Sequence, residues 1–312
     1  MIRGAYMSKA IVAAVAMTMF ILVPAFANWQ LPFGKDAGMV GIIAPVGAED
    51  FPVGPASFRV VGDNLWVLDS ANGRVLCFDA ASKLVKQVAV PALPKEFILD
   101  DFALQFASKD AAEPSAIIVV EAMERLIIKF AIDGKELLKI KPDNLIQIDE
   151  IDIDSTGQFY VGDYANSVIA VFAADGKQLR QVPWQCSGFA IDGDNNLHMI
   201  HFEDKTGHFH IKLAAAGAEL SRTQLGLPEM QNPRIWNVSA NGEYLLSFIP
   251  PVGDTNSQVL HTYSPAGEIL KKVEFKNPYY IKRYLCAGKE SAWLVEADYS
   301  RAPEQPVTFK QL

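Results

Sequence analysis

The sequence predicts an all-β fold, a six-bladed β-propeller whose four-stranded blades form a ring. Three observations predict it. One pattern of apolar strands and Gly/Asn/Asp turns recurs six times, the recurrence averages about 45 residues, and segments with helical spacing of apolar residues are absent. Repeats of roughly 40–50 residues made of four short strands are typical of propeller blades. With 312 residues, half of them apolar, the chain has enough material for a large core.

The N-terminus precedes the first repeat and has the organisation of a secretory signal peptide. Residues 1–27 combine two basic side chains, the apolar run Ile11–Val23 and the small-x-small site Ala25–Ala27. The apolar run is too short for a comfortable membrane span. We therefore expect cleavage before Asn28, a single propeller domain over residues 28–312, no membrane span after processing, and a periplasmic or secreted protein.

The six copies of the pattern follow one another along the rest of the chain. In order they cover Phe58–Leu84, Phe102–Leu137, Ile151–Leu179, Phe189–Leu220, Val238–Leu270 and a last copy from Tyr280 to Leu312. The second strand of each copy carries one anchor residue, and the anchors are Trp66, Ile118, Tyr160, His198, Leu245 and Trp293. Their mean spacing sets the number of blades at six, and we expect the aromatic anchors to pack between blades.

The last copy is too short for a complete blade. It has room for three strands, near residues 280–286, 291–297 and 305–311. Because an open sheet edge is a liability, the ring has to be closed by a strand from elsewhere. The apolar segment Met39–Ala44 has no partner in the first copy, so we predict that this N-terminal strand joins the C-terminal blade.

Two copies resemble the NHL-repeat family of six-bladed propellers. The similarity is carried by LWVLDSANGRVLCFD (Leu65–Asp79) and FYVGDYANSVIAVFAADG (Phe159–Gly176) and extends more loosely from about residue 56 to the end. The resemblance implies the six-bladed fold. It implies less about function, because such propellers include binding modules and a minority of enzymes.

Gluconolactonases and streptogramin lyases are enzymes with related propellers, and their motifs are not reproduced. Gluconolactonase-like proteins hold a divalent metal with Glu-Gly-Pro, Asn and Asp, whereas this chain has Val53–Pro55, Asp149-Glu150 and Cys186–Gly188 at the corresponding places. The lyase resemblance implies a catalytic histidine in the closing blade, but all five histidines lie between His198 and His261. Neither activity is implied residue by residue.

Acidic residues are expected on one face of the ring, where second strands end and first strands begin. Two carboxylates that end second strands, Asp69 and Asp163, each start an Asp-x-x-Asn turn and have a structural role there. Four others begin first strands near the channel and lack a turn role: Asp100, Asp101, Asp149 and Glu150. They form either a divalent cation site balanced by Arg234 or a solvated acidic rim.

A histidine-rich hairpin is a second candidate site. If Glu203–Thr206 is a four-residue turn, His201 lies opposite His208, with His210 on the same face. Three imidazoles suit copper or zinc. The alternative is an ordinary outer hairpin of polar and packing residues. His198 takes the place of an aromatic anchor and is expected in the core.

Long loops in the last three blades are candidate recognition surfaces. They carry aromatic residues, prolines and guanidinium groups, which are typical of binding hot spots. The predicted ligand-binding residues are Phe202, Arg234, Phe248, Pro250, Pro251, Tyr280, Tyr299 and Arg301.

The motifs and the charge of the sequence favour a binding function over catalysis. No nucleophile elbow, phosphate loop, dinucleotide fingerprint or HExxH motif is present, and the formal charge of −8 without a basic run argues against nucleic acid. The favoured hypothesis is an exported, non-catalytic propeller that binds a protein, peptide or glycan. The alternatives are a metal-dependent hydrolase or lyase that uses the acidic rim, and a copper- or zinc-binding accessory protein that uses the histidine hairpin.

Overall fold

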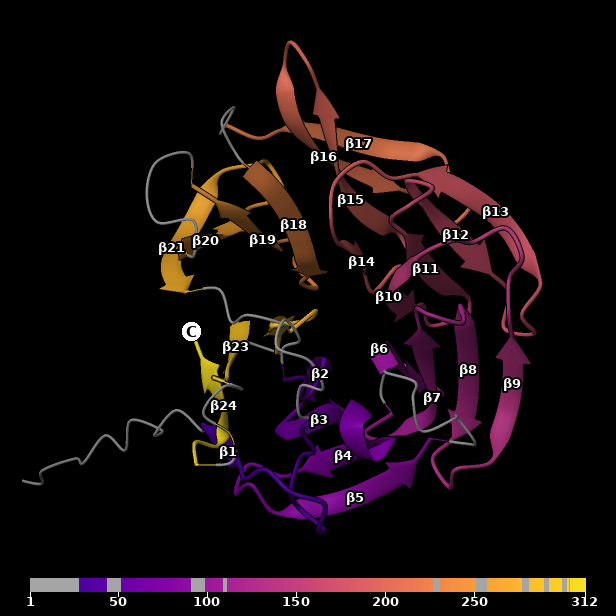
Figure 1. Cartoon of the computed structure of the whole chain (residues 1–312). Helices are drawn as coiled ribbons and strands as arrows, with labels where there is room; N and C mark the ends of the chain where they lie inside the picture. Colours follow the sequence, from indigo (N-terminus) through magenta and orange to yellow (C-terminus); the bar gives the residue numbers. More distant parts are fainter. Residues whose placement is uncertain are drawn as a thin grey trace, which may run out of the picture.

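The structure, a computed structural model, describes residues 28–43, 52–90, 99–108, 111–226, 231–250, 257–276, 281–288, 292–298, 302 and 304–312. In these ranges six four-stranded antiparallel sheets form a ring, which confirms the predicted six-bladed β-propeller (Figure 1). The predicted signal peptide lies outside the described residues. Within those residues no helix is long and apolar enough to cross a bilayer.

Five blades each consist of four consecutive strands that run outward from the channel. The first two blades are β2 (Ser57–Val61), β3 (Asn64–Asp69), β4 (Arg74–Phe78) and β5 (Leu84–Ala89), then β6 (Leu99–Phe106), β7 (Pro114–Glu121), β8 (Leu126–Ala131) and β9 (Glu136–Ile140). The third and fourth blades are β10 (Ile148–Ile153), β11 (Phe159–Asp163), β12 (Val168–Phe172) and β13 (Gln178–Pro183), then β14 (Phe189–Ile191), β15 (Leu197–Glu203), β16 (Gly207–Leu213) and β17 (Glu219–Gln224). The fifth blade is β18 (Gln231–Val238), β19 (Tyr244–Ile249), β20 (Ser257–Tyr263) and β21 (Ile269–Lys276).

The sixth blade joins the two ends of the described chain. Its strands, from the channel outward, are β22 (Leu285–Ala287), β23 (Ala292–Glu296), β24 (Val307–Gln311) and β1 (Trp29–Leu31). Trp29 pairs with Phe309, and its ring lies 4.3 Å from that of Trp293. The prediction that an N-terminal strand closes the ring is therefore confirmed.

The prediction that Met39–Ala44 is the closing strand is wrong. Its described residues, 39–43, lie against the first blade, where the Gly41 amide donates a 2.7 Å hydrogen bond to Asp69 and Arg74 donates to the Met39 carbonyl. Val40 makes a parallel bridge to Phe33 and is fully buried. The physical reason is that Trp29 and Leu31 bury two large side chains within three residues, so a shorter strand suffices at the edge.

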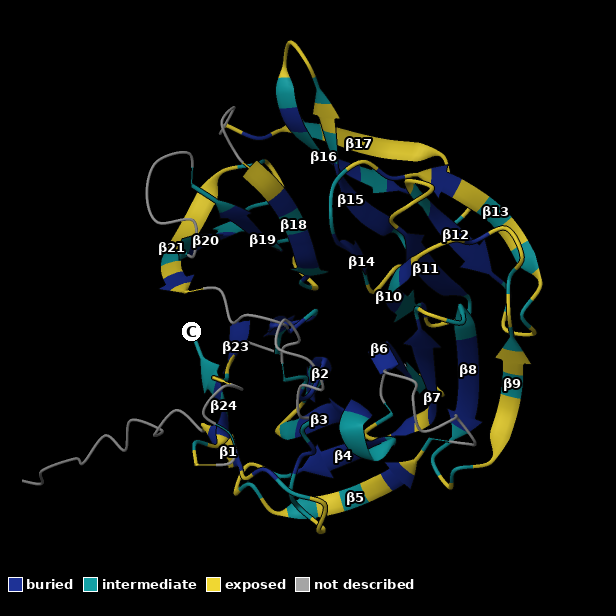
Figure 2. Ribbon diagram, viewed as in Figure 1, coloured by how far each residue is buried: buried dark blue, intermediate teal, exposed yellow. Residues whose placement is uncertain are grey.

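Apolar side chains fill the contacts between neighbouring blades. Figure 2 shows buried residues on the inner strands and exposed residues on the outer strands of the ring. The aromatic anchors are in the core as expected, with Trp66, Tyr160 and Trp293 3%, 0% and 7% exposed. The inner strands have few polar residues because both faces of each sheet are buried there. The polar residues that do occur on these strands are therefore candidates for a functional or structural role.

Asp69 and Asp163 have the predicted structural role in the Asp-x-x-Asn turns, although the asparagine bonds the carboxylate through its side chain. The Asn72 amide donates to Asp69 at 2.9 Å, and the Asn166 amide donates to Asp163 at 2.7 Å. Both aspartates are buried, and Asp69 also accepts a hydrogen bond from Arg74. These carboxylates therefore hold turns and are not free for catalysis.

Trp29→Ala is expected to destabilise the ring by about 3–5 kcal/mol, the range for removing a buried aromatic side chain. In this variant the edge strand β1 would lose its contact with Trp293. The matched control is Gln30→Ala, because Gln30 is the neighbouring residue and is exposed. Urea unfolding of both variants measures the difference. Equal unfolding free energies for the two variants would show that β1 does not close the ring.

Candidate functional site

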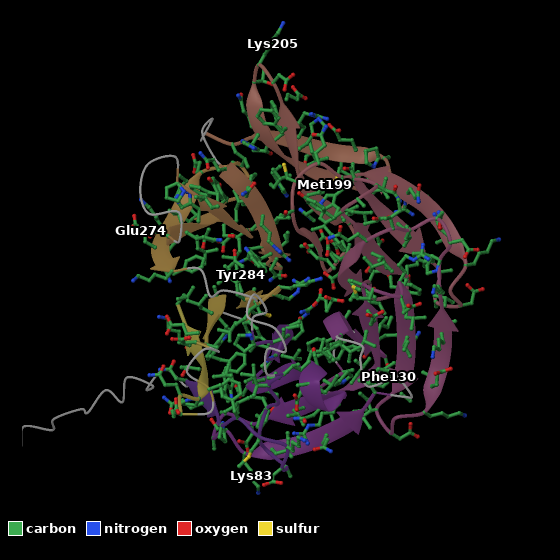
Figure 3. All side chains as sticks on the ribbon, in the orientation of Figure 1. Lys83, Phe130, Met199, Lys205, Glu274 and Tyr284 are labelled. Atoms are coloured by element: carbon green, nitrogen blue, oxygen red, sulfur yellow. The ribbon has the colours of Figure 1, made fainter. Side chains whose placement is uncertain are left out.

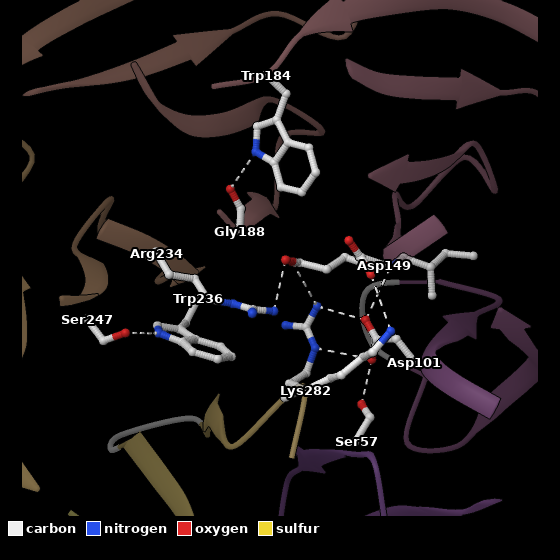
Figure 4. Close-up of polar contacts among 12 residues, drawn as sticks. Ser57, Asp101, Asp149, Trp184, Gly188, Arg234, Trp236, Ser247 and Lys282 are labelled. Carbon is white, nitrogen blue, oxygen red and sulfur yellow. Dashed lines mark hydrogen bonds and ion pairs between the residues drawn. The ribbon is translucent and has the colours of Figure 1, made fainter. Parts of the chain in front are cut away.

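Charged side chains from five blades meet where the inner strands begin, at one mouth of the channel (Figure 4). Four acidic residues there are those predicted from sequence: Asp100, Asp101, Asp149 and Glu150. Four basic residues pair with them: Arg59, Arg234, Lys282 and Arg283. We refer to these eight residues as the mouth cluster.

Asp101 has the largest number of partners in the mouth cluster. Its carboxylate accepts hydrogen bonds from Ser57 at 2.5 Å, from Arg59 at 3.1 Å and from Arg283 at 3.1 and 3.3 Å. The Ile151 amide also donates to it, at 3.2 Å. Burial alone would raise the pKa of Asp101, but the two guanidinium groups and the hydrogen bonds outweigh it and hold the pKa well below its usual range. Asp101 is therefore ionised and fully engaged.

Glu150 is held from the opposite side of the channel. Arg234 donates to it at 2.9 Å, and Arg283 lies 3.9 Å away. The guanidinium of Arg234 also lies 4.2 Å from the ring centre of Trp236, whose indole N–H donates to Ser247. This packing against an aromatic face fixes the direction of Arg234 and keeps it on Glu150.

Lys282 bridges the remaining pair of carboxylates. Its ammonium lies 2.5 Å from Asp100 and 3.3 Å from Asp149. Burial would lower the pKa of Lys282, but the two carboxylates reverse the effect and raise it. Burial raises the pKa of Asp100, and the Lys282 charge only partly opposes this. Lys282 is the most exposed base of the cluster, with 38% of its side chain accessible.

The ion pairs show that the predicted acidic residues are not a rim of solvated carboxylates. Four carboxylates face four bases of the same chain, so the cluster supplies its own counter-charges. The described residues contain no group of three His, Cys, Asp or Glu side chains placed to hold a metal ion. Sequence reasoning included only Arg234 as a counter-charge. It overlooked Arg59, Lys282 and Arg283, although adjacent basic residues just before the last inner strand were a usable signal.

The predicted histidine register is wrong by one residue. His201 pairs with Phe209, and His208 pairs with Phe202. Gly207 adopts a φ of +88° and pairs with Glu203, so three residues rather than four form the hairpin loop. The shift puts His201 on the opposite face from His208 and His210, because side chains alternate along a strand. The proposed copper or zinc site loses the geometry on which it depended.

The predicted ligand-binding residues differ in their exposure and in whether the structure describes them. Phe202 is 40% exposed near the tip of the β15–β16 hairpin, which projects from the ring with Lys205 at its end (Figure 3). The prediction that Phe248 contacts a ligand is wrong, because Phe248 is only 5% exposed and packs edge-on against His261. Pro250 is half-buried, and Arg234 belongs to the mouth cluster. Four predicted residues lie outside the described ranges: Pro251, Tyr280, Tyr299 and Arg301.

Apart from exposed apolar residues on the outer strands of the blades, four exposed apolar side chains lie near the ends of strands in blades 2 to 4. Met123 is 84% exposed, Ile146 and Tyr164 are each 60% exposed, and Phe202 completes the series. Met123, Ile146 and Tyr164 lie in turns or connections, and Phe202 is the next-to-last residue of β15. They lie toward the face that holds the mouth cluster, where second strands end beside the start of first strands. We call these four residues the apolar arc.

The loops of the apolar arc contact one another. Arg125 donates to the Leu145 carbonyl, and the Ile146 amide donates to Asp163 at 2.9 Å. The Phe202 amide donates a 3.1 Å hydrogen bond to the side-chain oxygen of Gln185, in the connection between blades 3 and 4. These contacts tie the blade 2 turn to the entry of blade 3 and tie the β15–β16 hairpin to the entry of blade 4. The sequence prediction included Phe202 but missed Met123, Ile146 and Tyr164, which lie in short segments between strands that carry no binding motif.

Comparison with known proteins supports the fold and no finer assignment. No protein-family profile and no curated protein sequence matches the chain. Among solved structures, a member of the DUF4221 family from Bacteroides vulgatus matches with a TM-score of 0.56 at 11% identity, over 91% of this chain and 95% of that one. A streptogramin B lyase matches with a TM-score of 0.54 at 14% identity, over 92% and 87%.

A third similar structure is virginiamycin B lyase from Staphylococcus aureus, with a TM-score of 0.53 at 16% identity, over 86% of this chain and 81% of that one. The resemblance predicted from the repeats is thus confirmed for the fold. At such low identity these similarities carry no activity to this chain.

Arg283→Met is expected to destabilise the protein by about 3–5 kcal/mol, because it leaves Asp101 buried without its bidentate partner. Lys282→Met, at the more exposed bridge, is the control and is expected to cost at most about 1 kcal/mol. Unfolding in urea at pH 7 measures both.

Acidification supplies the second readout for the same variant. The folded-state pKa of Asp101 is depressed, so its stabilisation is present above pH about 4 and is lost as the pH falls further. Arg283→Met should weaken this acid-dependent loss. Equal stability of Arg283→Met and wild type would refute a supporting role for the pair.

Proposed function

We propose that the protein is an exported propeller that binds a protein or peptide partner through the apolar arc and catalyses no reaction. The observation that carries this proposal is the exposure of Met123, Ile146, Tyr164 and Phe202 at the same end of three successive blades. Single exposed apolar residues are ordinary on protein surfaces, whereas several that gather on one face are typical of interaction sites.

The residue types favour a protein or peptide over a glycan. Sugar rings are commonly held against flat aromatic faces, while the arc combines one tyrosine and one phenylalanine with the aliphatic Met123 and Ile146. Methionine adapts its shape to irregular apolar partners. Polar groups surround the arc, among them the ion pair of Glu124 with Lys141. An apolar centre with a polar rim is the usual anatomy of a protein interface.

The mouth cluster supports binding without chemistry. A hydrolase or lyase of the metal-dependent type needs carboxylates free to hold a cation, and here Asp101 and Glu150 are each held by arginines. A general acid or base needs a side chain that can exchange a proton near neutral pH. Asp101, with its pKa well below the usual range, is unsuited to that work.

The N-terminal sequence supports export. Residues 1–27 carry two basic and no acidic side chains, so their removal changes the formal charge from −8 to −8 − 2 = −10. We therefore place the partner in the periplasm, on the cell surface or outside the cell.

Site-specific photo-crosslinking tests the proposal. A benzophenone amino acid at Tyr164, in the arc, should capture a discrete partner from an envelope or secreted fraction of the source cells. The same group at Leu220, which is 55% exposed on the outer strand β17, is the matched control and should not. Once the partner is purified, Tyr164→Ala and Phe202→Ala should each weaken binding by about 1–2 kcal/mol, as expected for interface anchors.

Two outcomes would contradict the proposal. One is capture of the same partner with equal yield from Leu220, which would place contact outside the arc. The other is unchanged affinity in both alanine variants.

A further inference from the structure

The contact between blades 4 and 5 contains two buried imidazoles where the earlier blades have packing residues. The β-sheet registers make His198 equivalent to Trp66, Ile118 and Tyr160, and His210 equivalent to Val75, Ile127 and Ile169. His198 is 2% exposed and His210 is 4% exposed. Neither histidine takes part in the mouth cluster or the apolar arc.

The two imidazoles form a chain of hydrogen bonds that begins at the carboxylate of Asp192. His198 Nε2 lies 3.0 Å from Asp192, and His198 Nδ1 lies 2.9 Å from His210 Nε2. The His198 and His210 rings meet edge to edge with their centres 5.0 Å apart, and the His210 ring is stacked on Tyr244 of blade 5, at 4.0 Å. Tyr244 is stacked in turn on Tyr263, at 5.3 Å. The imidazole pair is thus part of the packing that joins the two blades.

The partners determine where the protons are. Asp192 is a carboxylate that only accepts, so His198 carries a proton on Nε2 and its Nδ1 accepts from His210 Nε2–H. The neutral pair therefore holds two protons. The remaining nitrogen, His210 Nδ1, is buried and has no hydrogen-bond partner.

A third proton cannot be accommodated without a buried, unmatched N–H. If it enters at His198 Nδ1, the proton of His210 has to move to its own Nδ1. If it enters His210 directly, it again occupies Nδ1. Either state adds a positive charge next to the tyrosine stack and leaves a donor without an acceptor, and both are unfavourable in an apolar contact.

The surrounding charged groups do not remove this conflict. Asp192 is shared with Lys212, which lies 2.9 Å from it. Other titratable groups facing the contact are His208 on β16, Tyr244 on β19, and His261 and Tyr263 on β20. Burial lowers the pKa of His198 despite the nearby Asp192, and burial together with the charge of His198 lowers the pKa of His210 to about 3.

We propose that the contact between blades 4 and 5 is an acid-sensitive joint, which is closed while His198 and His210 hold two protons and is loosened by a third. The depressed pKa values in the folded state set the direction of the effect. Below pH about 6.5 the unfolded chain binds protons that His198 and His210 do not bind in the folded protein. The free energy of unfolding is therefore highest above that pH and falls as the pH decreases.

The test compares unfolding of the mature protein in urea between pH 7.5 and pH 5. For wild type, the unfolding equilibrium constant should rise about tenfold per pH unit for each proton that only the unfolded chain binds. The double variant His198→Tyr/His210→Ile carries the residues of blade 3 at the same positions and should lose this part of the pH dependence. His201→Gln, on the other face of the same hairpin, is the control and should keep the wild-type dependence.

A second measurement on the unmodified protein applies even if the double variant does not fold. Two-bond ¹H–¹⁵N NMR spectra of histidine-labelled wild type should show both His198 and His210 protonated on Nε2 at pH 7, with no titration of this pair above pH 5.5 in the folded state. Titration of either imidazole near pH 6.5 without loss of the blade contact would overturn the proposal. So would a double variant with the pH dependence of wild type.

Discussion

The carboxylate of Asp101 is in contact with four of the six blades. It lies on blade 2 and accepts hydrogen bonds from Ser57 and Arg59 of blade 1, from the backbone of Ile151 on blade 3, and from Arg283 before the inner strand of blade 6. Inner strands of a propeller converge on the channel, where a buried charge without a partner is strongly unfavourable. The rest of the mouth cluster extends this contact, since Glu150 and Arg234 bring in blade 5.

The apolar contacts between blades and the charge contacts at the channel have different roles. The former supply most of the burial, in clusters that alternate with the sheets around the ring. The latter connect inner strands across the channel, mostly between blades that are not adjacent, and a buried carboxylate without its base is strongly unfavourable. Closure by β1 completes the arrangement, and Trp29 makes a three-residue strand sufficient.

Much of the fold follows from local sequence signals. The repeat spacing fixes six blades, and turn chemistry explains Asp69 and Asp163, since both signals are contained within a few residues. The closing strand was missed because Trp29–Leu31 is too short to show alternation. The histidine register depended on one residue, Gly207, whose positive φ shortened the loop.

The candidate site was less predictable than the fold. The four carboxylates could be placed near the channel, but Arg59 and Arg283 are brought to Asp101 from positions 42 before and 182 after it, and no local pattern records such a pairing. The apolar arc depends in the same way on the ring, which places turns from successive blades side by side. Tyr164 is an ordinary turn residue until Ile146 lies beside it.

The central claim is that the carboxylates at the channel mouth serve the bases of this chain and not a bound cation. Elemental analysis of the purified protein, after equilibration with calcium, magnesium, zinc and copper salts and removal of excess metal, tests it most directly. Our account predicts far less than one metal ion per chain. One metal ion per chain that disappears in Asp149→Asn would contradict it and would assign the mouth cluster to metal chemistry.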